Sequence, residues 1–298
     1  MSWKMLPIVR SLFGVAILCV GALCETPAQA LDKSYVFPVN EGNLVHYQRF
    51  LDGRDPLKIN DFSGPNLNRH VFEFITFQRA LHDGGCDCKV EYVPFTADTS
   101  HARAIAEVKA GREISHPVAG FDSDPRYAEG IYLSVPILNA DEFYVGLYTH
   151  SERQDILSLR DKEAIHNLRY TASESWVVDM QVLRSYRFHV VPAFSWQSAI
   201  DMIRFERADI ILQPVSPEPD FHFTIDDEGN RFLPIPGVKL NFPAGRRYFV
   251  SRNHPDGAEF LEVLNRGLQK LESSGYLRKG QIAAGVIDPR IKDWEVVR

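Results

Sequence analysis

The sequence predicts an α/β fold, in which the strands of a sheet are joined by right-handed helical crossovers. Segments in which polar and apolar residues alternate, as in strands, take turns with segments whose apolar residues recur at helical spacing. This alternation occurs in two runs, one before about residue 150 and one after about residue 155, without an internal sequence repeat. The 298 residues suffice for one large domain or two modest ones, even without an N-terminal segment.

The first run centres on a helix predicted over residues 71–81, because apolar residues recur there at helical spacing and Gly84 and Gly85 follow. The stretch 40–69 carries no pattern to which an element can be assigned. The other elements of this run are expected as strands at 34–40, 89–95, 118–121 and 142–149 and as a helix at 101–110 capped by Thr99 or Ser100.

The second run contains a hydroxyl-rich turn at 171–175, between a predicted strand and a predicted helix. Near the end of the chain, residues 258–273 present a broad apolar face, which predicts a helix packed on the core. The acidic segment 226–230 predicts an exposed turn. The remaining elements are expected as strands at 166–170, 188–191, 208–212 and 247–251 and as helices at 176–183 and 196–206.

The N-terminus has the pattern of a secretory signal peptide. Basic residues Lys4 and Arg10 precede an apolar run at 12–23, and the small-residue pattern at 28–30 is typical of a cleavage site. The apolar run is shorter than the roughly 20 residues that span a bilayer, which disfavours a retained anchor. We therefore expect residues 1–30 to be removed and the protein to be exported to the periplasm.

The charge of the mature chain argues against polyanionic partners. After residue 30, 31 basic and 38 acidic side chains remain, a net charge of −7 without a basic run. Nucleic acids and anionic membrane surfaces are poor partners for such a surface. Scattered histidines and the absence of a Gly-x-Ser-x-Gly or Gly-rich phosphate motif predict no metal, no cofactor and no catalytic residues.

Two cysteines, Cys86 and Cys88, follow the predicted signal peptide. A disulfide between residues two apart needs a bend in the chain, which Gly84 and Gly85 can supply. A local bridge is the favoured interpretation, two reduced thiols come next, and a metal site is least favoured because no ligand lies at suitable spacing.

The segment 123–136 carries the features of a receptor for a small anion. Arg126 follows a helix-start signal in which Ser123 is the expected cap and Pro125 lies in the first turn. A helix start favours anions, and arginine adds a fixed positive charge. The alternative is a surface helical turn with a solvated arginine.

Several short segments, in their order along the chain, resemble the periplasmic solute-binding proteins of the amino-acid type, family 3. Ser123-Asp-Pro-Arg126 is similar to the family's Thr-x-x-Arg element, and Leu133-Ser-Val-Pro136 to its Phe-Ser-x-Pro element. The other similar segments are Ala102–Gly111, Tyr170–Ser173, Arg207–Asp209 and Phe260–Lys279. The resemblance implies a two-lobed, type II periplasmic-binding-protein-like fold with a hinge and an interlobe cleft. It implies that residues 31–150 and 236–298 form lobe 1 and residues 151–235 form lobe 2.

The resemblance also implies which residues contact the ligand. Arg126 would bind a ligand carboxylate in a bidentate manner, as arginine does better than lysine. Ser123 would add its hydroxyl and backbone N–H, and Asp209 would accept from a ligand amine. Thr171 and Ser173 would donate to the anion from the second lobe. The candidates that would pack against the apolar part of the ligand are Tyr35, Phe37 and Tyr132.

These features together predict a non-enzymatic, monomeric solute-binding protein. It would capture a small, amino-acid-like or carboxylate-bearing solute by hinge closure and present it to an ABC permease or a membrane receptor. One alternative is an exported, dehydratase-like enzyme of the same fold, with Asp209 or Glu174 as its acid or base. Another is a regulatory factor whose cleft docks a protein.

Overall fold

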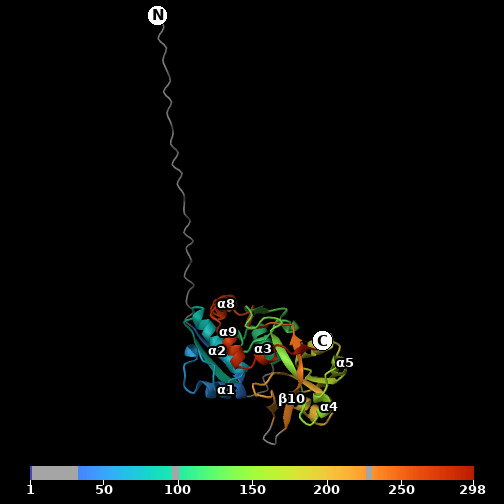
Figure 1. Cartoon of the computed structure of the whole chain (residues 1–298). Helices are drawn as coiled ribbons and strands as arrows, with labels where there is room; N and C mark the ends of the chain where they lie inside the picture. Colours follow the sequence, from blue (N-terminus) through green and yellow to red (C-terminus); the bar gives the residue numbers. More distant parts are fainter. Residues whose placement is uncertain (2–32, 96–100, 226–229) are drawn as a thin grey trace.

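Apolar residues of the chain gather into two main cores, each built around strands and the helices that pack on them. The computed structural model describes residues 1, 33–95, 101–225 and 230–298. Figure 1 shows α1, α2, α8 and α9 gathered on one side of the molecule and α4, α5 and β10 on the other. We call the core around α2 the first core and the core around the large sheet the second core.

The first core surrounds α2 (Arg69–Asp83), whose side chains are buried on nearly every face. Asn68 caps this helix by accepting from the backbone N–H of Val71. β1 (Ser34–Asn40) and β2 (Lys89–Phe95) form a parallel pair beside it. The remaining elements here are α1 (Glu41–Leu51), η1 (Pro56–Lys58), α3 (His101–Lys109), β3 (Gly120–Phe121), η2 (Pro125–Tyr127), β4 (Ile131–Leu133), β11 (Arg246–Arg247), β12 (Phe249–Ser251), α8 (Gly257–Ser273) and α9 (Tyr276–Ala283).

The second core belongs to a seven-stranded mixed sheet with the order β13-β10-β5-β8-β6-β7, and β9 adds to β10. α6 (Val177–Ser185) supplies apolar residues to the second core, while α7 (Trp196–Arg204) packs in a separate cluster with Tyr148 and Phe232 of the sheet. The other elements are β5 (Phe143–His150), α4 (Gln154–Leu157), α5 (Lys162–His166), β6 (Arg169–Ser173), β7 (His189–Ala193), β8 (Ile210–Pro214), β9 (Phe223–Thr224), β10 (Arg231–Phe242), η3 (Pro289–Ile291) and β13 (Glu295–Val296).

β5 and β10 lie next to each other in the middle of this sheet and run antiparallel, from Phe143 opposite Phe242 to His150 opposite Phe232. Their ladder shifts register between Pro234 and Lys239, where Gly237 has a φ of +83°. The expected lobe boundaries at residues 150 and 236 fall in these two strands, and that division stays a prediction.

Three sequence-based expectations are wrong in detail. The strand expected at 166–170 begins at Arg169, because residues 162–166 form α5 and residues 169–173 pair in a parallel ladder with β7. The hydroxyl-rich segment from Thr171 is therefore largely strand, since sheet pairing outweighs the turn preference of serine and threonine. The cap of the turn at Pro125 is Asp124, not Ser123, because the Asp124 carboxylate accepts from the backbone N–H of Arg126.

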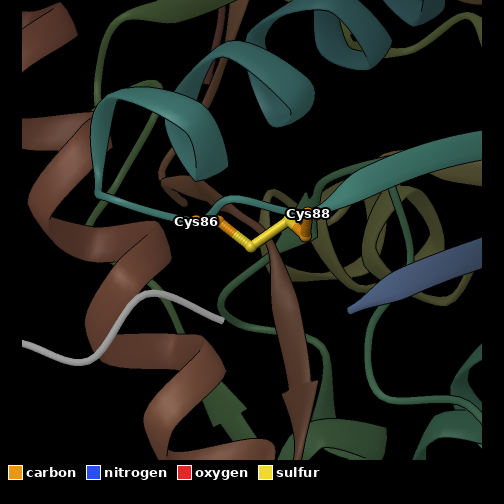
Figure 2. Close-up of a disulfide and its surroundings, with 2 residues drawn as sticks. All are labelled: Cys86 and Cys88. Atoms are coloured by element: carbon orange, nitrogen blue, oxygen red, sulfur yellow. A yellow bond between two sulfur atoms is a disulfide. The ribbon is translucent and has the colours of Figure 1, made fainter. Parts of the chain in front are cut away.

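The expected bridge between Cys86 and Cys88 is present, with the two Cα atoms 5.1 Å apart. Figure 2 shows it between the end of α2 and the start of β2. Gly85 has a φ of +98°, a conformation that other residues rarely adopt, and supplies the bend that the short bridge requires.

Other expectations fall on residues that the structure does not describe. The signal peptide, the caps Thr99 and Ser100 and most of the acidic turn at 226–230 lie outside the described residues. Within the described part of the chain, no helix has both the length and the apolar character that a membrane span requires.

Candidate functional site

A cavity of about 700 Å³ lies between the two cores and takes its lining from both. Its volume falls within the roughly 300–1,000 Å³ of typical small-molecule sites. The start of α2, the segment 118–126 and Arg246 form one wall. The start of α6, Trp196 and Phe223 belong to elements of the large sheet and its helices, and form the facing wall.

The first wall is organised around a buried carboxylate. Glu73, on α2, is 1% exposed, and its Oε1 accepts from Nη2 of Arg246 at 2.8 Å. Its Oε2 accepts from the backbone N–H of Ala119 at 3.2 Å, and Nε of Arg69 lies 3.9 Å from Oε1. One carboxylate therefore serves two guanidinium groups, and the wall keeps an excess of positive charge.

Arg69 has fewer hydrogen-bond partners than Arg246. Its Nε is buried and has no hydrogen-bond partner among the described residues, and Nη2 lies 3.3 Å from Nε2 of His70. Burial, together with repulsion from Arg246, lowers the pKa of Arg69 to about 10, so that the group still carries its charge at neutral pH. Arg69 is also one of the residues that line the cavity.

Arg126 also lines the cavity, and Asp124 holds it from behind. The Asp124 carboxylate accepts from Nε of Arg126 at 2.9 Å and also from Nη2. No residue in the described ranges bonds Nη1. Asp288-Pro289-Arg290 repeats this arrangement in η3, which shows that an Asp-Pro-Arg sequence folds locally into such a pair. Nη1 of Arg290, however, donates to the carbonyl of Glu218, whereas that of Arg126 borders the cavity.

The facing wall is aromatic and acidic. The rings of Trp176 and Trp196 lie 6.1 Å apart, and Phe223 lies 6.1 Å from Trp196. Asp179 lies one helical turn after Trp176 in α6. Burial raises the pKa of Asp179 to about 6, although the charges of Arg69 and Arg246 act in the opposite direction.

Two histidines, His70 and His101, complete the lining. Burial lowers the pKa of His101 to about 3 and that of His70 well below its usual value, and repulsion from nearby positive groups adds to both shifts. Nε2 of His101 lies 3.0 Å from the hydroxyl of Tyr127. Both rings are therefore neutral at physiological pH and serve as polar, uncharged groups.

Of the eight residues that the resemblance singles out, Arg126 is the one in the cavity lining. Ser123 is exposed outside it. Thr171 and Ser173 are buried in β6, where Thr171 Oγ1 lies 3.5 Å from the sulfur of Met202 and Ser173 Oγ lies 2.9 Å from Ser175 Oγ. Thr171 and Ser173 are two residues apart and so lie on the same face of β6, but neither lines the cavity, and both hydroxyls are engaged by neighbouring groups.

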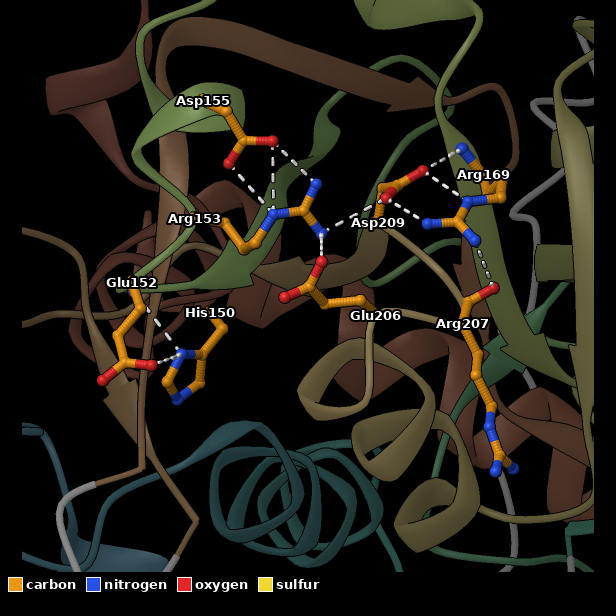
Figure 3. Close-up of polar contacts among 8 residues, drawn as sticks. All are labelled: His150, Glu152, Arg153, Asp155, Arg169, Glu206, Arg207 and Asp209. Carbon is orange, nitrogen blue, oxygen red and sulfur yellow. Dashed lines mark hydrogen bonds and ion pairs between the residues drawn. The ribbon is translucent and has the colours of Figure 1, made fainter.

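Asp209 lies outside the cavity lining, in a polar cluster at the start of β8 (Figure 3). Its carboxylate accepts from Nε and Nη2 of Arg169 at 2.9 and 2.7 Å, and Nη1 of Arg153 lies 3.4 Å away. Burial acts to raise the pKa of Asp209, but the hydrogen bonds from Arg169 and the charge of Arg153 outweigh it and leave the pKa below its ordinary value.

The three aromatic candidates belong to the first core rather than to the cavity. Phe37 is 1% exposed and packs edge-on against Phe77. Tyr35 packs edge-on against Phe260. Tyr132 has the guanidinium of Arg252 stacked 4.5 Å from its ring centroid.

The sequence reasoning did not single out Arg69, Arg246, Asp179, Trp176 or Trp196 as site residues. A usable signal was the position of Arg69 and Trp176 at the starts of two helices, because helix starts favour bound anions. Arg246 gave no such signal, since its two-residue strand has no pattern of its own. Within the described ranges, no group of three or more histidine, cysteine, aspartate or glutamate side chains could hold a metal ion.

Comparison with solved structures identifies the fold. No family model matches the sequence, and no curated protein matches it by sequence. The arginine-bound substrate-binding protein of an amino-acid ABC transporter from Streptococcus pneumoniae has a TM-score of 0.50, with 16% identity over 72% of this chain and 83% of that one. The periplasmic VFT2 domain of BvgS from Bordetella pertussis has a TM-score of 0.53, with 15% identity over 83% of this chain and 92% of that one.

A third structure is the periplasmic binding protein of an arginine transport system from Legionella pneumophila. It has a TM-score of 0.51 and is 15% identical over 84% of this chain and 98% of that one. At such identities the comparisons show the fold, and the type II periplasmic-binding-protein fold that the sequence predicts is confirmed.

Proposed function

We propose that the protein is an exported solute-binding protein that holds a small carboxylate-bearing solute in the cavity between its two cores. The observation that carries this proposal is the convergence of Arg69, Arg126 and Arg246 on one cavity of about 700 Å³. Among the described residues, Nη1 of Arg126 has no hydrogen-bond partner, and Arg69 and Arg246 share the single carboxylate of Glu73. A carboxylate offers two acceptor oxygens to such donors.

Hinge closure is part of the proposal. Residues 31–150 and 236–298 would form one lobe and residues 151–235 the other, so that the arginine wall and the Trp176 wall approach each other over the solute. The three compared structures share this fold, and they are named as two binding proteins and one periplasmic domain. Two of them are named as parts of amino-acid or arginine transport systems, which supports an amino-acid-like solute here.

The location and partner follow from the same function. The chain would be delivered to the periplasm by residues 1–30 and act there as a monomer without a cofactor. It would present its solute to an ABC permease or to a membrane receptor.

The positions of the candidate catalytic carboxylates favour a binding protein over a dehydratase-like enzyme. Asp209, one of the two candidate acids or bases of that alternative, is bonded to Arg169 and lies outside the cavity lining. Its lowered pKa keeps it ionised at neutral pH and unable to donate a proton. The other candidate, Glu174, is exposed and does not line the cavity either.

A thermal-shift screen of the chain after residue 30 against amino acids, organic acids and peptides tests the proposal. A ligand at a hundredfold excess over Kd adds roughly 2.7 kcal/mol of stability. Arg126→Ala should abolish most of that gain, whereas the matched control Arg290→Ala removes the same local pair outside this cavity and should keep it. Ligand stabilisation that survives Arg126→Ala unchanged would refute the role of Arg126, and turnover of a compound would favour the enzyme.

A further inference from the structure

A second cavity, of about 260 Å³, adjoins the first one. Val215, Gly285 and Val286 line both cavities, so these residues lie between the two spaces. The rest of the second cavity is lined from the start of β5, from β10, from α9 and from the segment 287–292 near the end of the chain. The three arginines of the first cavity do not line it.

Lys239, on β10, is the buried charge of the second cavity. Its side chain is 5% exposed, and its Nζ donates to the carbonyls of Ile291 and Lys292 at 2.7 and 3.0 Å. Nζ also lies 4.2 Å from the centroid of the Tyr144 ring. These neighbours offer only partial negative charge, and no carboxylate oxygen of the described residues lies within 4 Å of Nζ. Burial lowers the pKa of Lys239, and the more distant charge of Asp293 opposes this shift.

The carboxylates on the wall of the second cavity do not compensate Lys239, because each already accepts a hydrogen bond from another donor. The pairs are Asp288 with Arg290, Asp141 with Asn241, and Glu142 with Asn139. A buried charge without an ionic partner is costly to the fold. Water can complete the hydrogen bonds of the ammonium group, but only an anion can neutralise its charge.

We propose that the second cavity binds a small monovalent anion, chloride or a short carboxylate such as acetate, against the ammonium group of Lys239. One negative charge matches the one positive charge that lacks an ionic partner. The cavity is smaller than the roughly 300–1,000 Å³ of typical small-molecule sites, so it suits an anion of few atoms. Lysine presents a compact point charge, which suits such an anion better than the planar fork of arginine would. This site does not depend on the proposed function.

A bound anion would also strengthen the attachment of the end of the chain to the large sheet. Lys239 lies at the register shift of β10, and it is paired with Val296 of β13. The two carbonyls that its ammonium group holds belong to the end of η3 and the residue after it. Because the anion removes the cost of burying this charge, its binding should stabilise the whole fold.

Thermal unfolding of the chain after residue 30 in increasing sodium chloride, and separately in sodium acetate, tests the site. At a tenfold excess of anion over Kd, Tm of the wild type should rise by about 3–6 °C more than Tm of Lys239→Met. General salt effects act on both proteins and cancel in this difference. The larger of the chloride and acetate shifts identifies the anion that the site prefers.

Two further variants serve as controls. Lys270→Met is matched to Lys239→Met, because Nζ of Lys270 also donates to a carbonyl, that of Asp83, but outside both cavities. It should keep the full anion shift. Arg126→Ala should keep it as well, which separates the second cavity from anion binding at the arginine wall of the first.

Bromide locates the anion in the wild-type protein and so does not depend on the folding of Lys239→Met. Crystals grown in sodium bromide should show an anomalous diffraction peak beside Nζ of Lys239. An equal anion shift in Lys239→Met and the wild type, loss of the shift in Arg126→Ala, or the lack of this peak would overturn the proposal. A bromide peak without any anion shift in solution would mean an adventitious ion only, and would overturn it too.

Discussion

Replacing Asp179 by asparagine should make the unliganded protein more stable at neutral pH. Burial raises the pKa of Asp179 from 3.8 to about 6. Each unit corresponds to about 1.4 kcal/mol, so ionised Asp179 costs the folded state at most about 3 kcal/mol. Because the side chain is half-buried and borders a cavity that water enters, we expect a gain of about 1–3 kcal/mol for Asp179→Asn.

The stability gained by Asp179→Asn should depend on pH, because Asp179 titrates and asparagine does not. The folded state holds the Asp179 proton more tightly than the unfolded chain, so the wild-type protein loses stability as the pH rises from about 4 to about 6. Asparagine does not titrate, and the advantage of Asp179→Asn should shrink below about 1 kcal/mol at pH 4. Urea denaturation followed by circular dichroism at pH 7.5 and pH 4 measures this, with Glu259→Gln as the control, because Glu259 occupies the same third position of α8 and is exposed. A variant less stable than the wild type at pH 7.5, or an equal gain at both pH values, would refute the reasoning.

Arg246→Met should cost about 3–5 kcal/mol, because it strands the buried carboxylate of Glu73, and the added change Glu73→Gln should recover part of this in urea denaturation. If Arg246→Met alone is as stable as the wild type, the claim that Arg246 compensates the buried charge of Glu73 is wrong. Asp209→Asn should cost about 1–3 kcal/mol, since it breaks the pair with Arg169, yet leave ligand affinity unchanged. A selective loss of affinity would place Asp209 back in the site.

The sequence predicts the long helices well, because their apolar spacing comes from residues that are neighbours along the chain. α2 and α8 lie within two residues of their expected bounds. α1 was not predicted, because three buried residues, Leu44, Tyr47 and Phe50, are its whole apolar face and polar residues surround them. The start of β6 was misplaced, because its partner β7 lies twenty residues further on and local composition carries no trace of that pairing.

The candidate site depends even more on contacts between residues that are far apart in the sequence, which local patterns do not predict. The sequence predicts Arg126 from its immediate neighbours, with Ser123 as the expected cap and Pro125 in the first turn, and the structure places the cap one residue later, at Asp124. Asp209 was expected in the cleft, but its partner Arg169 is 40 residues away in the sequence, and that pairing decides its role. Arg246 depends on Glu73, 173 residues away, and neither residue belongs to a motif that indicates the other.

The distance along the chain between Glu73 and Arg246 also constrains the order in which the molecule assembles. The carboxylate of Glu73 gathers an N–H from residue 119 and a guanidinium from residue 246, so the wall is incomplete until nearly the entire chain has been synthesised. The chain loses conformational entropy when a loop of that length closes, before the contacts that stabilise it can form. Such long-range contacts slow folding. The charged wall that Glu73 and Arg246 form is therefore one of the last parts of the fold to be completed.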